Sequence, residues 1–214
     1  MVPIKVDAMT NMDPKRLSAI ERINVIGTSG SGKSTFGRNL AGILGFPFIE
    51  MDALYWKPNW QEPTDEEFES KVKAATEDSH WVLDGNYSRT TSIKWRHVQQ
   101  VVWLDMSFVR TVFQVTKRCI KRSLNQTEFW PGTGNRETLR KAFLSRESVI
   151  LWSISSYGRN RRRYSRMMQS PEFSHIWFVR LKSTNGIRLF LEAARIAPII
   201  VMLSKSQPLR RLPI

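Results

Sequence analysis

The sequence predicts an α/β fold with a mostly parallel, five-stranded sheet that is covered by helices on both faces. Three observations support this prediction. Five short apolar runs alternate with stretches of helical periodicity, a glycine-rich loop follows the first run, and polar residues stand where several runs end. Helical crossovers between strands are right-handed and make the strands parallel, so ligands are expected beyond the carboxyl ends of the strands.

The five strands are expected at "RINVIG", "FPFIEMD", "HWVLDG", "VVWLDM" and "HIWFVRL". "KSTFGRNLAGILG" follows the first strand as a helix that ends at Gly45, and "TDEEFESKVKAATED" is a helix with a capping box from Thr64 to Glu67. Further helices are expected after the fourth and fifth strands. Four residues at or just past strand ends are candidates for one cleft: Gly27, Asp52, Asp84 and Asp105.

The chain has 214 residues, of which 41% are hydrophobic, and this is enough for one domain with a sizeable core. We expect an N-terminal extension over residues 1–21, the main domain over 22–195 and a tail over 196–214. The single cysteine, Cys119, excludes a disulfide framework and a thiolate-rich metal site. The histidines at 80, 97 and 175 have no metal-ligand spacing.

Composition and apolar patterning also predict where the protein works. A lone cysteine fits a reducing cytoplasm. The N-terminus lacks the apolar run and small-residue cleavage site of a signal peptide, and the longest late apolar run, "IAPIIVML", is too short to span a bilayer. A cytoplasmic protein with no membrane partner is expected.

"GTSGSGKST", residues 27–35, has the spacing of a phosphate-binding loop: glycine, four residues, then glycine, lysine and serine. The glycines allow backbone conformations in which amide N–H groups point at an anion, and the helix that opens there adds partial positive charge. Lys33 is predicted to reach the β- and γ-phosphates, and Ser34 to bind Mg²⁺. The predicted ATP-binding residues are Gly27, Ser29, Gly30, Ser31, Gly32, Lys33, Ser34 and Thr35.

A second informative stretch is "WVLDGNYSRT", residues 81–90. Asp84 ends a run of apolar residues, where a carboxylate can hold Mg²⁺ or one of its waters opposite Ser34. The alternative is an aspartate that caps a turn. Arg89, beyond the turn, is placed to grip a phosphoryl group or a carboxylate of the acceptor, although its position alone also fits a solvated surface arginine.

These motifs carry a resemblance to a known family. "DGNYSRT" resembles the Asp-Gly-Phe-Pro-Arg-Thr signature of adenylate kinases, and "VVWLDMSFVRTVFQVTKRCIKR" is similar to their fourth strand and the helix that approaches the lid. With "MDALYWKPNW" and "WLD", the chain most resembles the adenylate-kinase-related proteins often labelled DNA topology modulation proteins. The resemblance implies a P-loop NTPase fold with a helical, arginine-rich lid at about 123–166, and phosphoryl transfer from ATP with Mg²⁺.

The segment from 53 to 80 is short, is rich in Trp and Pro, and shows no clear nucleoside-monophosphate pocket, so the acceptor stays open. Asp52 resembles in position the acidic residue that shikimate and gluconate kinases use on a substrate hydroxyl, and a turn-capping role is the alternative. Three aromatic residues fit either stacking on an acceptor ring or packing under the next helix: Tyr55, Trp56 and Trp60.

The net charge of +14 is concentrated, since residues 110–170 hold 14 Lys or Arg against 3 Glu and no Asp, an excess of +11. Arg118 and Arg122 are one helical turn apart and match the helix before the lid. The returning lid arginines correspond to Arg159, Arg162 and Arg166, although Arg161 and Arg163 crowd the same stretch and a solvated face is the alternative for each. Weaker candidates are Arg136 and Arg146. The turn at 183–185 resembles the loop that packs against adenine.

The predicted function is transfer of the γ-phosphoryl of Mg-ATP to a nucleotide or a small hydroxylated metabolite, with Lys33, Asp52, Arg89, Arg118 and Arg122 as catalytic residues. The alternative is a nucleic-acid-binding ATPase that grips phosphates with the basic 110–170 region. The chain lacks an Asn-Lys-x-Asp segment and a Leu-Ser-Gly-Gly-Gln segment, which argues against a guanine-specific switch and a transporter-type ATPase.

Overall fold

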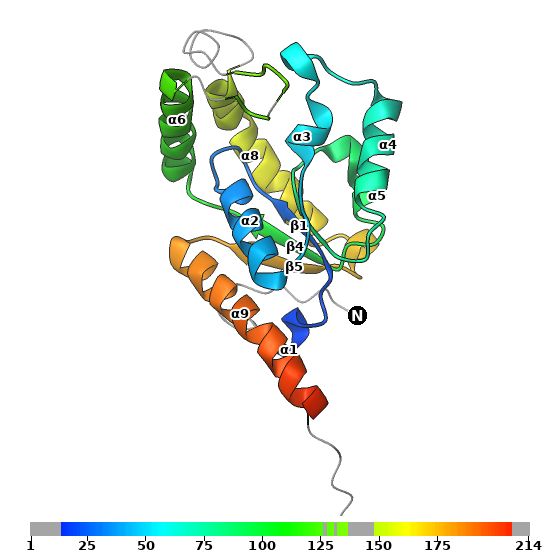
Figure 1. Cartoon of the computed structure of the whole chain (residues 1–214). Helices are drawn as coiled ribbons and strands as arrows, with labels where there is room; N and C mark the ends of the chain where they lie inside the picture. Colours follow the sequence, from blue (N-terminus) through cyan, green and yellow to red (C-terminus); the bar gives the residue numbers. More distant parts are fainter. Residues whose placement is uncertain (1–13, 126–127, 131, 137–147, 207–214) are drawn as a thin grey trace, which may run out of the picture.

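One parallel sheet organises the protein in the computed structural model, which describes residues 14–125, 128–130, 132–136 and 148–206. Its strand order is β2-β3-β1-β4-β5 (Figure 1), and all four neighbouring pairs are parallel. The strands are β1 (Arg22–Ile26), β2 (Phe48–Glu50), β3 (Trp81–Asp84), β4 (Gln100–Leu104) and β5 (Trp177–Leu181). The predicted five-stranded sheet is confirmed.

Helices connect successive strands and continue beyond the sheet. They are α1 (Pro14–Leu17), α2 (Lys33–Leu44), α3 (Met51–Tyr55), α4 (Asp65–Ala75), α5 (Thr91–Lys94), α6 (Phe108–Asn125), α8 (Val149–Met167) and α9 (Thr184–Ser206). Short 3₁₀ turns lie at Pro58–Trp60, Ser88–Thr90 and Pro171–Phe173. Within the described ranges, no helix combines the length and apolar character needed to cross a bilayer.

The predicted helix ends are confirmed by their local geometry. Gly45 closes α2 in the left-handed region, at φ 71°, and its N–H donates to the carbonyl of Ala41. Thr64 caps α4, because its hydroxyl accepts the backbone N–H of Glu67 at 3.2 Å.

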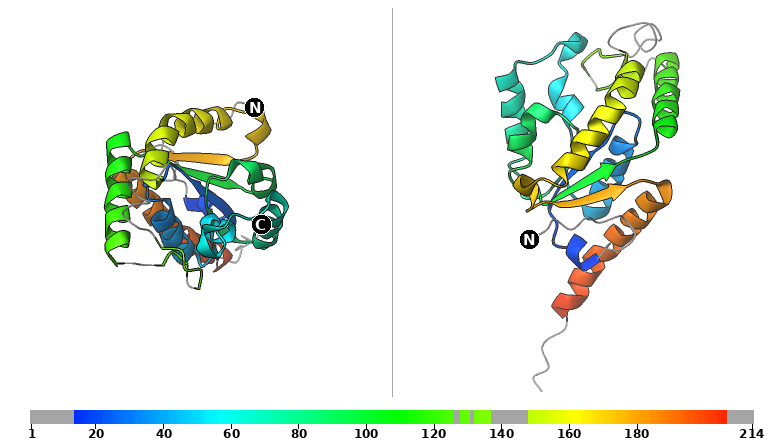
Figure 2. Two further views of the ribbon diagram at one scale, coloured as in Figure 1. Left: turned by 90° about the horizontal axis from the view of Figure 1, so that it is seen from above. Right: turned by 180° about the vertical axis from the view of Figure 1, so that it is seen from behind.

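Helices cover both faces of the sheet (Figure 2). On one face, α2 and α9 build a core around Val25, Phe36 and Phe190. On the other, α4, α5 and α8 build a core rich in large aromatic side chains, Phe68, Trp81, Trp95, Trp103 and Tyr164 among them. Burial on both faces explains why β1, β3 and β4 are continuous apolar runs without alternation. A third, smaller cluster joins α6 to α8 through Val115, Cys119 and Ile150.

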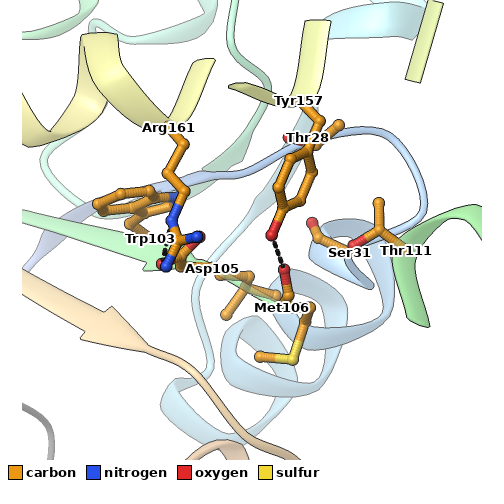
Figure 3. A pocket seen from close by; sticks show the side chains of 9 residues that line it. Thr28, Ser31, Trp103, Asp105, Met106, Thr111, Tyr157 and Arg161 are labelled. Carbon is orange, nitrogen blue, oxygen red and sulfur yellow. Dashed lines mark hydrogen bonds and ion pairs between the residues drawn. The ribbon is translucent and has the colours of Figure 1, made fainter. Parts of the chain in front are cut away.

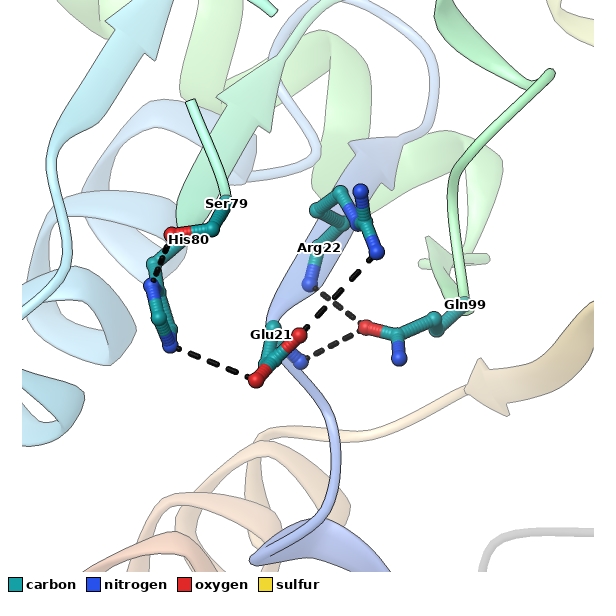
Figure 4. A network of polar contacts seen from close by, with 5 residues as sticks. All are labelled: Glu21, Arg22, Ser79, His80 and Gln99. Atoms are coloured by element: carbon teal, nitrogen blue, oxygen red, sulfur yellow. Dashed lines mark hydrogen bonds and ion pairs between the residues drawn. The ribbon is translucent and has the colours of Figure 1, made fainter. Parts of the chain in front are cut away.

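Polar contacts close the amino end of the sheet, on the side away from the phosphate loop (Figure 4). The side-chain oxygen of Gln99 accepts the backbone N–H groups of Glu21 at 2.8 Å and Arg22 at 3.0 Å. The Glu21 carboxylate lies 3.4 Å from His80, whose other ring nitrogen lies 2.6 Å from Ser79 Oγ. His80 therefore has a structural role there, as its lack of metal-ligand spacing suggested.

Two element boundaries differ from those expected. β2 ends at Glu50, so Asp52 lies in the first turn of α3 and not directly after a strand. α9 continues to Ser206, so the boundary expected at 195 falls inside a helix.

Within the expected extension, α1 packs on α9, with Leu17 buried. α6 ends inside the expected lid at Asn125, α8 makes up most of its second half, and Arg146 lies outside the described residues.

Candidate active site

The phosphate loop between β1 and α2 needs its glycines. Gly30 and Gly32 have φ of 87° and 93°, in the left-handed region that side chains disfavour. A Cβ on Gly30 would lie 2.4 Å from the carbonyl oxygen of Thr111, and one on Gly27 would lie 2.7 Å from that of Leu104. The loop is therefore pressed against β4 and α6, while nothing stands within 4 Å of a Cβ built on Gly32.

Lys33, Ser34 and Asp84 meet beside this loop. The Ser34 hydroxyl donates to Asp84 Oδ2 at 2.5 Å, and Lys33 Nζ lies 3.5 Å from the Thr28 carbonyl oxygen. Burial raises the pKa of Asp84, and the nearby Lys33 and the Ser34 hydrogen bond partly offset this effect. The second carboxylate oxygen of Asp84, Oδ1, is buried and has no hydrogen-bond partner.

This pair of oxygen ligands fits a magnesium ion. A buried carboxylate with an unpartnered oxygen beside a hydroxyl supplies hard ligands, and Mg²⁺ in phosphate-transfer sites takes its other ligands from water and substrate phosphates. In the part of the chain that the structure describes, no three His, Cys, Asp or Glu side chains gather as an all-protein metal site. Ser34 and Asp84 would therefore hold Mg²⁺ together with bound nucleotide.

Asparagines join the turn after β3 to the phosphate loop. Asn86 donates to the Gly27 carbonyl at 2.7 Å and accepts the Gly27 N–H at 3.0 Å. Asn24, fully buried in β1, donates to the carbonyl of Leu83 at 2.9 Å and accepts from Trp95 Nε1 at 2.8 Å. Sequence reasoning missed both roles. The position of Asn86 inside "DGNYSRT" was the only available signal for them.

Lys94, the last residue of α5, is a buried cation behind this turn. Its Nζ lies 3.3 Å from the Gly85 carbonyl oxygen and 3.7 Å from Met51 Sδ. Burial, followed by repulsion from Arg163, lowers the pKa of Lys94 to about 7, and Asp84 acts in the opposite direction. No pattern in the sequence indicates Lys94, because its burial depends on the way α5 packs.

Asp52 lies in the first turn of α3 and accepts a 2.7 Å hydrogen bond from the Tyr87 hydroxyl. Burial raises the pKa of Tyr87, and the carboxylate of Asp52 raises it further, so the hydroxyl stays protonated and donates. The Tyr87 ring packs against the Tyr55 ring, with the two ring centres 5.0 Å apart. Asp52 is itself exposed and so is accessible to a solute.

Arg89 is engaged by protein groups. It forms an ion pair with Asp65 in the first turn of α4, and its guanidinium lies 4.9 Å from the Tyr55 ring centre and 5.4 Å from that of Phe68. The side chain stays partly exposed, so Arg89 borders the acceptor side without being buried there.

The three aromatic residues considered for stacking are packed to different degrees. Tyr55 is buried against Phe68 and Tyr87, as core packing requires. Trp56 and Trp60 are half-buried and contact each other edge to face, with ring centres 5.4 Å apart. Both tryptophans therefore keep some surface toward solvent.

Arg118 and Arg122 of α6 contact different partners. Arg118 donates to Ser29 Oγ of the phosphate loop at 3.1 Å, and from α8 the buried Ser153 donates to the Ser29 carbonyl at 2.8 Å. Arg122 stacks on Phe129, with its guanidinium carbon 4.2 Å from the ring centre. α6, which leads into the expected lid, and α8, which lies within it, thus both contact the loop directly.

Asp105 does not join the predicted cleft as a free carboxylate. Arg180 forms a two-nitrogen contact with its Oδ2, and Arg161 of α8 lies 3.3 Å from the same oxygen (Figure 3). Tyr157 donates to the carbonyl of Met106 at 2.9 Å in the same cluster, which lies beside Thr28 and Ser31 of the phosphate loop. Asp105 is therefore neutralised by arginines, and Arg161 is not simply a solvated residue.

The remaining sequence candidates differ in their burial and in their contacts. Thr35 is exposed, whereas Ser31 is buried and its hydroxyl has no hydrogen-bond partner. Arg159 stacks over Trp152 at 5.6 Å, and Arg162 and Arg166 are exposed on α8. At the turn expected near adenine, Ser183 Oγ accepts the Gly186 N–H at 3.0 Å and Thr184 accepts from Arg110 at 2.8 Å.

Comparison with solved structures supports the fold. No model of a protein family matches the sequence, and neither does any curated protein. A shikimate kinase from Bacteroides thetaiotaomicron is similar, with a TM-score of 0.50, 13% identity, and coverage of 86% of this chain and 99% of that one.

Two other solved structures are also similar to this chain. A shikimate kinase from Acinetobacter baumannii in complex with shikimate has a TM-score of 0.49 at 16% identity and covers 91% of this chain and 99% of its own. A gluconokinase from Sinorhizobium meliloti has a TM-score of 0.45 at 16% identity and covers 87% and 98%. The chain has the α/β fold of P-loop kinases.

Proposed function

We propose that this protein is an ATP-dependent kinase that transfers the γ-phosphoryl of Mg-ATP to a small hydroxylated molecule or a nucleotide. The observation that carries the proposal is the juxtaposition of Ser34 and Asp84 at the phosphate loop, where Asp84 Oδ1 is buried without a partner. The shikimate kinase from Bacteroides thetaiotaomicron, which has a similar fold, agrees with it. The resemblance of "DGNYSRT" to adenylate-kinase-related proteins is part of the same proposal.

On the donor side, the loop amides and Lys33 would bind the β- and γ-phosphates of ATP. Bound Mg²⁺ would neutralise phosphate charge between Ser34 and Asp84. Arg118 already contacts Ser29, so its guanidinium lies at the loop and can stabilise charge on the transferred phosphoryl oxygens. Arg122 is one turn further along α6 and stays in the proposal as a second lid-side cation.

On the acceptor side, Asp52 would orient the attacking hydroxyl or accept its proton. Its hydrogen bond from Tyr87 fixes the carboxylate, and its exposed position leaves an oxygen for the acceptor. Arg89 would exchange Asp65 for an anionic group of the acceptor, because both bind a guanidinium in the same way. We infer an acceptor that carries a hydroxyl and a negative charge.

The test is coupled ATP turnover with Mg²⁺ against a panel of nucleoside monophosphates, nucleosides, and hydroxylated sugar acids and ring acids. Stimulation by one small molecule, with a phosphorylated product detected by mass spectrometry, is expected. Turnover stimulated by DNA or RNA alone, with free phosphate as the product, would instead support the nucleic-acid ATPase.

Two variants assign the sides of the cleft. Lys33→Ala is expected to lower kcat at least about 10²-fold with the fold intact, because the side chain neutralises phosphate charge and is not core. Arg89→Ala is expected to raise the KM for the acceptor while leaving the KM for ATP within about threefold. Arg96→Ala, an exposed arginine on the same segment, is the matched control. A loss confined to ATP affinity in Arg89→Ala would place Arg89 on the donor side.

A further inference from the structure

The described residues 128–130 and 132–136, beyond α6, are hydrogen-bonded to the Trp-rich segment 56–60, although Asn135 follows Trp60 by 75 residues in the chain. Asn135, which is fully buried, makes two of the hydrogen bonds between these segments. Its Oδ1 accepts the backbone N–H of Trp60 at 2.8 Å, and its Nδ2 donates to the carbonyl of Lys57 at 3.0 Å. A third bond runs from the Asn59 N–H to the carbonyl of Thr133 at 3.2 Å.

Asn135 is also held within its own segment. Its carbonyl accepts the Phe129 N–H at 2.9 Å, and Glu128 and Arg136 form an antiparallel bridge around it. The Glu128 carboxylate accepts the N–H of Gly134. The backbone of Asn135 is hydrogen-bonded within its own segment, and its side-chain amide is hydrogen-bonded to Lys57 and Trp60. Asn135 therefore links two segments of the chain.

The segment that Asn135 holds has an unfavourable backbone. Asn59 and Trp60 both lie in the left-handed region, at φ 58° and 60°, and are the two non-glycine residues with positive φ among those described. Asparagine adopts this conformation readily, whereas it costs a residue such as tryptophan about 1–2 kcal/mol and then persists where surrounding contacts hold it. The two hydrogen bonds of Asn135 fall on either side of Asn59, at the Lys57 carbonyl and at the Trp60 N–H.

Aromatic contacts continue from this turn to α6. The Trp60 ring lies edge to face with Trp56 at 5.4 Å and with Phe129 at 5.1 Å. Phe129 also contacts α6, because the guanidinium carbon of Arg122 lies 4.2 Å from the Phe129 ring centre. One turn earlier on α6, Arg118 donates to Ser29 of the phosphate loop. Contiguous contacts therefore run from the acceptor side to the donor side.

We propose that Asn135 is a positioning residue that holds the strained Asn59–Trp60 turn as one wall of the acceptor side and joins that wall to the arginine-bearing face of α6. The term acceptor side rests on the proposed function. The geometric part of the proposal, that Asn135 imposes the turn, does not depend on any reaction.

The first test measures amide hydrogen exchange of the full chain by NMR. Asn135→Ala is expected to speed exchange of the Asn59 and Trp60 amides at least about tenfold, while amides at the centre of β1 keep their rates. Asn125→Ala, which removes an exposed asparagine at the end of α6, is the matched control and should change neither. Unchanged rates at Asn59 and Trp60, or an equal rise in every element, would overturn the proposal.

Asn135→Asp provides a variant of the same shape. It keeps the oxygen that accepts from Trp60, loses the N–H donor to Lys57 and buries a carboxylate oxygen beside the Lys57 carbonyl, so exchange at Asn59 and Trp60 should be faster than in wild type. Rates equal to wild type would show that the donor bond to Lys57 has no role in holding the turn.

The second test uses kinetics and a nucleotide probe. With any acceptor that the turnover panel identifies, Asn135→Ala should raise the acceptor KM about tenfold or more with kcat within about threefold. Affinity for Mg·AMP-PNP should fall less than about threefold, because Asn135 contacts no group of the phosphate loop. A fall in kcat at unchanged acceptor KM would contradict a positioning role. If wild type phosphorylates nothing, the proposed function fails, and the exchange test still decides whether Asn135 holds the turn.

Discussion

Two glycine substitutions, one at a crowded position in the phosphate loop and one at an open position in α2, together test the phosphate-loop geometry. Gly30→Ala places a methyl group 2.4 Å from the Thr111 carbonyl oxygen and 3.0 Å from Val115 Cβ, at a backbone φ of 87°. Gly42→Ala places the same group in the last turn of α2, with nothing within 4 Å and no unusual φ. The chemical change is identical, so a difference between the variants must come from local structure.

The two expected effects have opposite signs. The left-handed backbone costs Gly30→Ala about 1–2 kcal/mol, and moving α6 away from the loop adds about 1–3 kcal/mol, for a loss of about 2–5 kcal/mol. Gly42→Ala should gain about 0.5–1 kcal/mol from helix propensity. At about 2–4 °C per kcal/mol for a chain of this size, Gly30→Ala should lower Tm by about 4–20 °C, and Gly42→Ala should raise it slightly.

Thermal unfolding followed by circular dichroism, paired with Mg·AMP-PNP binding, measures both quantities. Gly30→Ala should also bind the analogue at least about tenfold more weakly, because the loop and α6 must separate, whereas Gly42→Ala should bind it normally. If Gly30→Ala melted at or above the wild-type temperature, the close approach of the loop to Thr111 would be wrong.

Two further predictions concern buried charges near the loop. Asp84→Asn should raise the Mg²⁺ concentration that half-saturates turnover at least about tenfold, while stability without metal is kept or increased, because burial disfavours the carboxylate; an unchanged Mg²⁺ dependence would remove Asp84 from the metal site. The pKa of Lys94 is lowered to about 7, so between pH 7 and its ordinary value of 10.5 the unfolded chain binds more protons and stability rises with pH. Lys94→Met should abolish this slope and be more stable at pH 7, as checked by urea unfolding at pH 7, 8.5 and 9.5. A difference between the two proteins that does not vary with pH would contradict the lowered pKa.

The features that sequence could predict are those set by local patterns. The five strands were identified from continuous apolar runs, and the ends of α2 and α4 from Gly45 and the Thr64 cap. The phosphate loop was identified because its glycines, Lys33 and Ser34 have fixed spacing. Asp84 was placed at a strand end by the same reasoning, and the fold brings it to Ser34. These signals need no knowledge of long-range contacts.

The features that sequence could not predict depend on contacts between distant segments. Asp105 was grouped with the cleft because it follows a strand, yet Arg180 and Arg161 neutralise it. Lys94 and Asn135 carried no motif, and their burial follows from the packing of α5 and of residues 128–136. A strand-end position is decided by neighbouring residues, whereas the partner of a charged or amide side chain is decided by the whole fold.

The basic stretch illustrates this distinction and weighs on function. From sequence alone, an excess of +11 over residues 110–170 favours either a lid or a nucleic-acid surface. In the structure, Arg118 contacts the phosphate loop, Arg122 stacks on Phe129 and Arg161 pairs with Asp105. Cations that grip a nucleic-acid backbone need to face solvent, whereas each of these three contacts a protein group, and of the three only Arg161 is half exposed. The hydrogen bond from Arg118 to Ser29 favours a role for that arginine at the phosphate loop over one in an extended nucleic-acid surface.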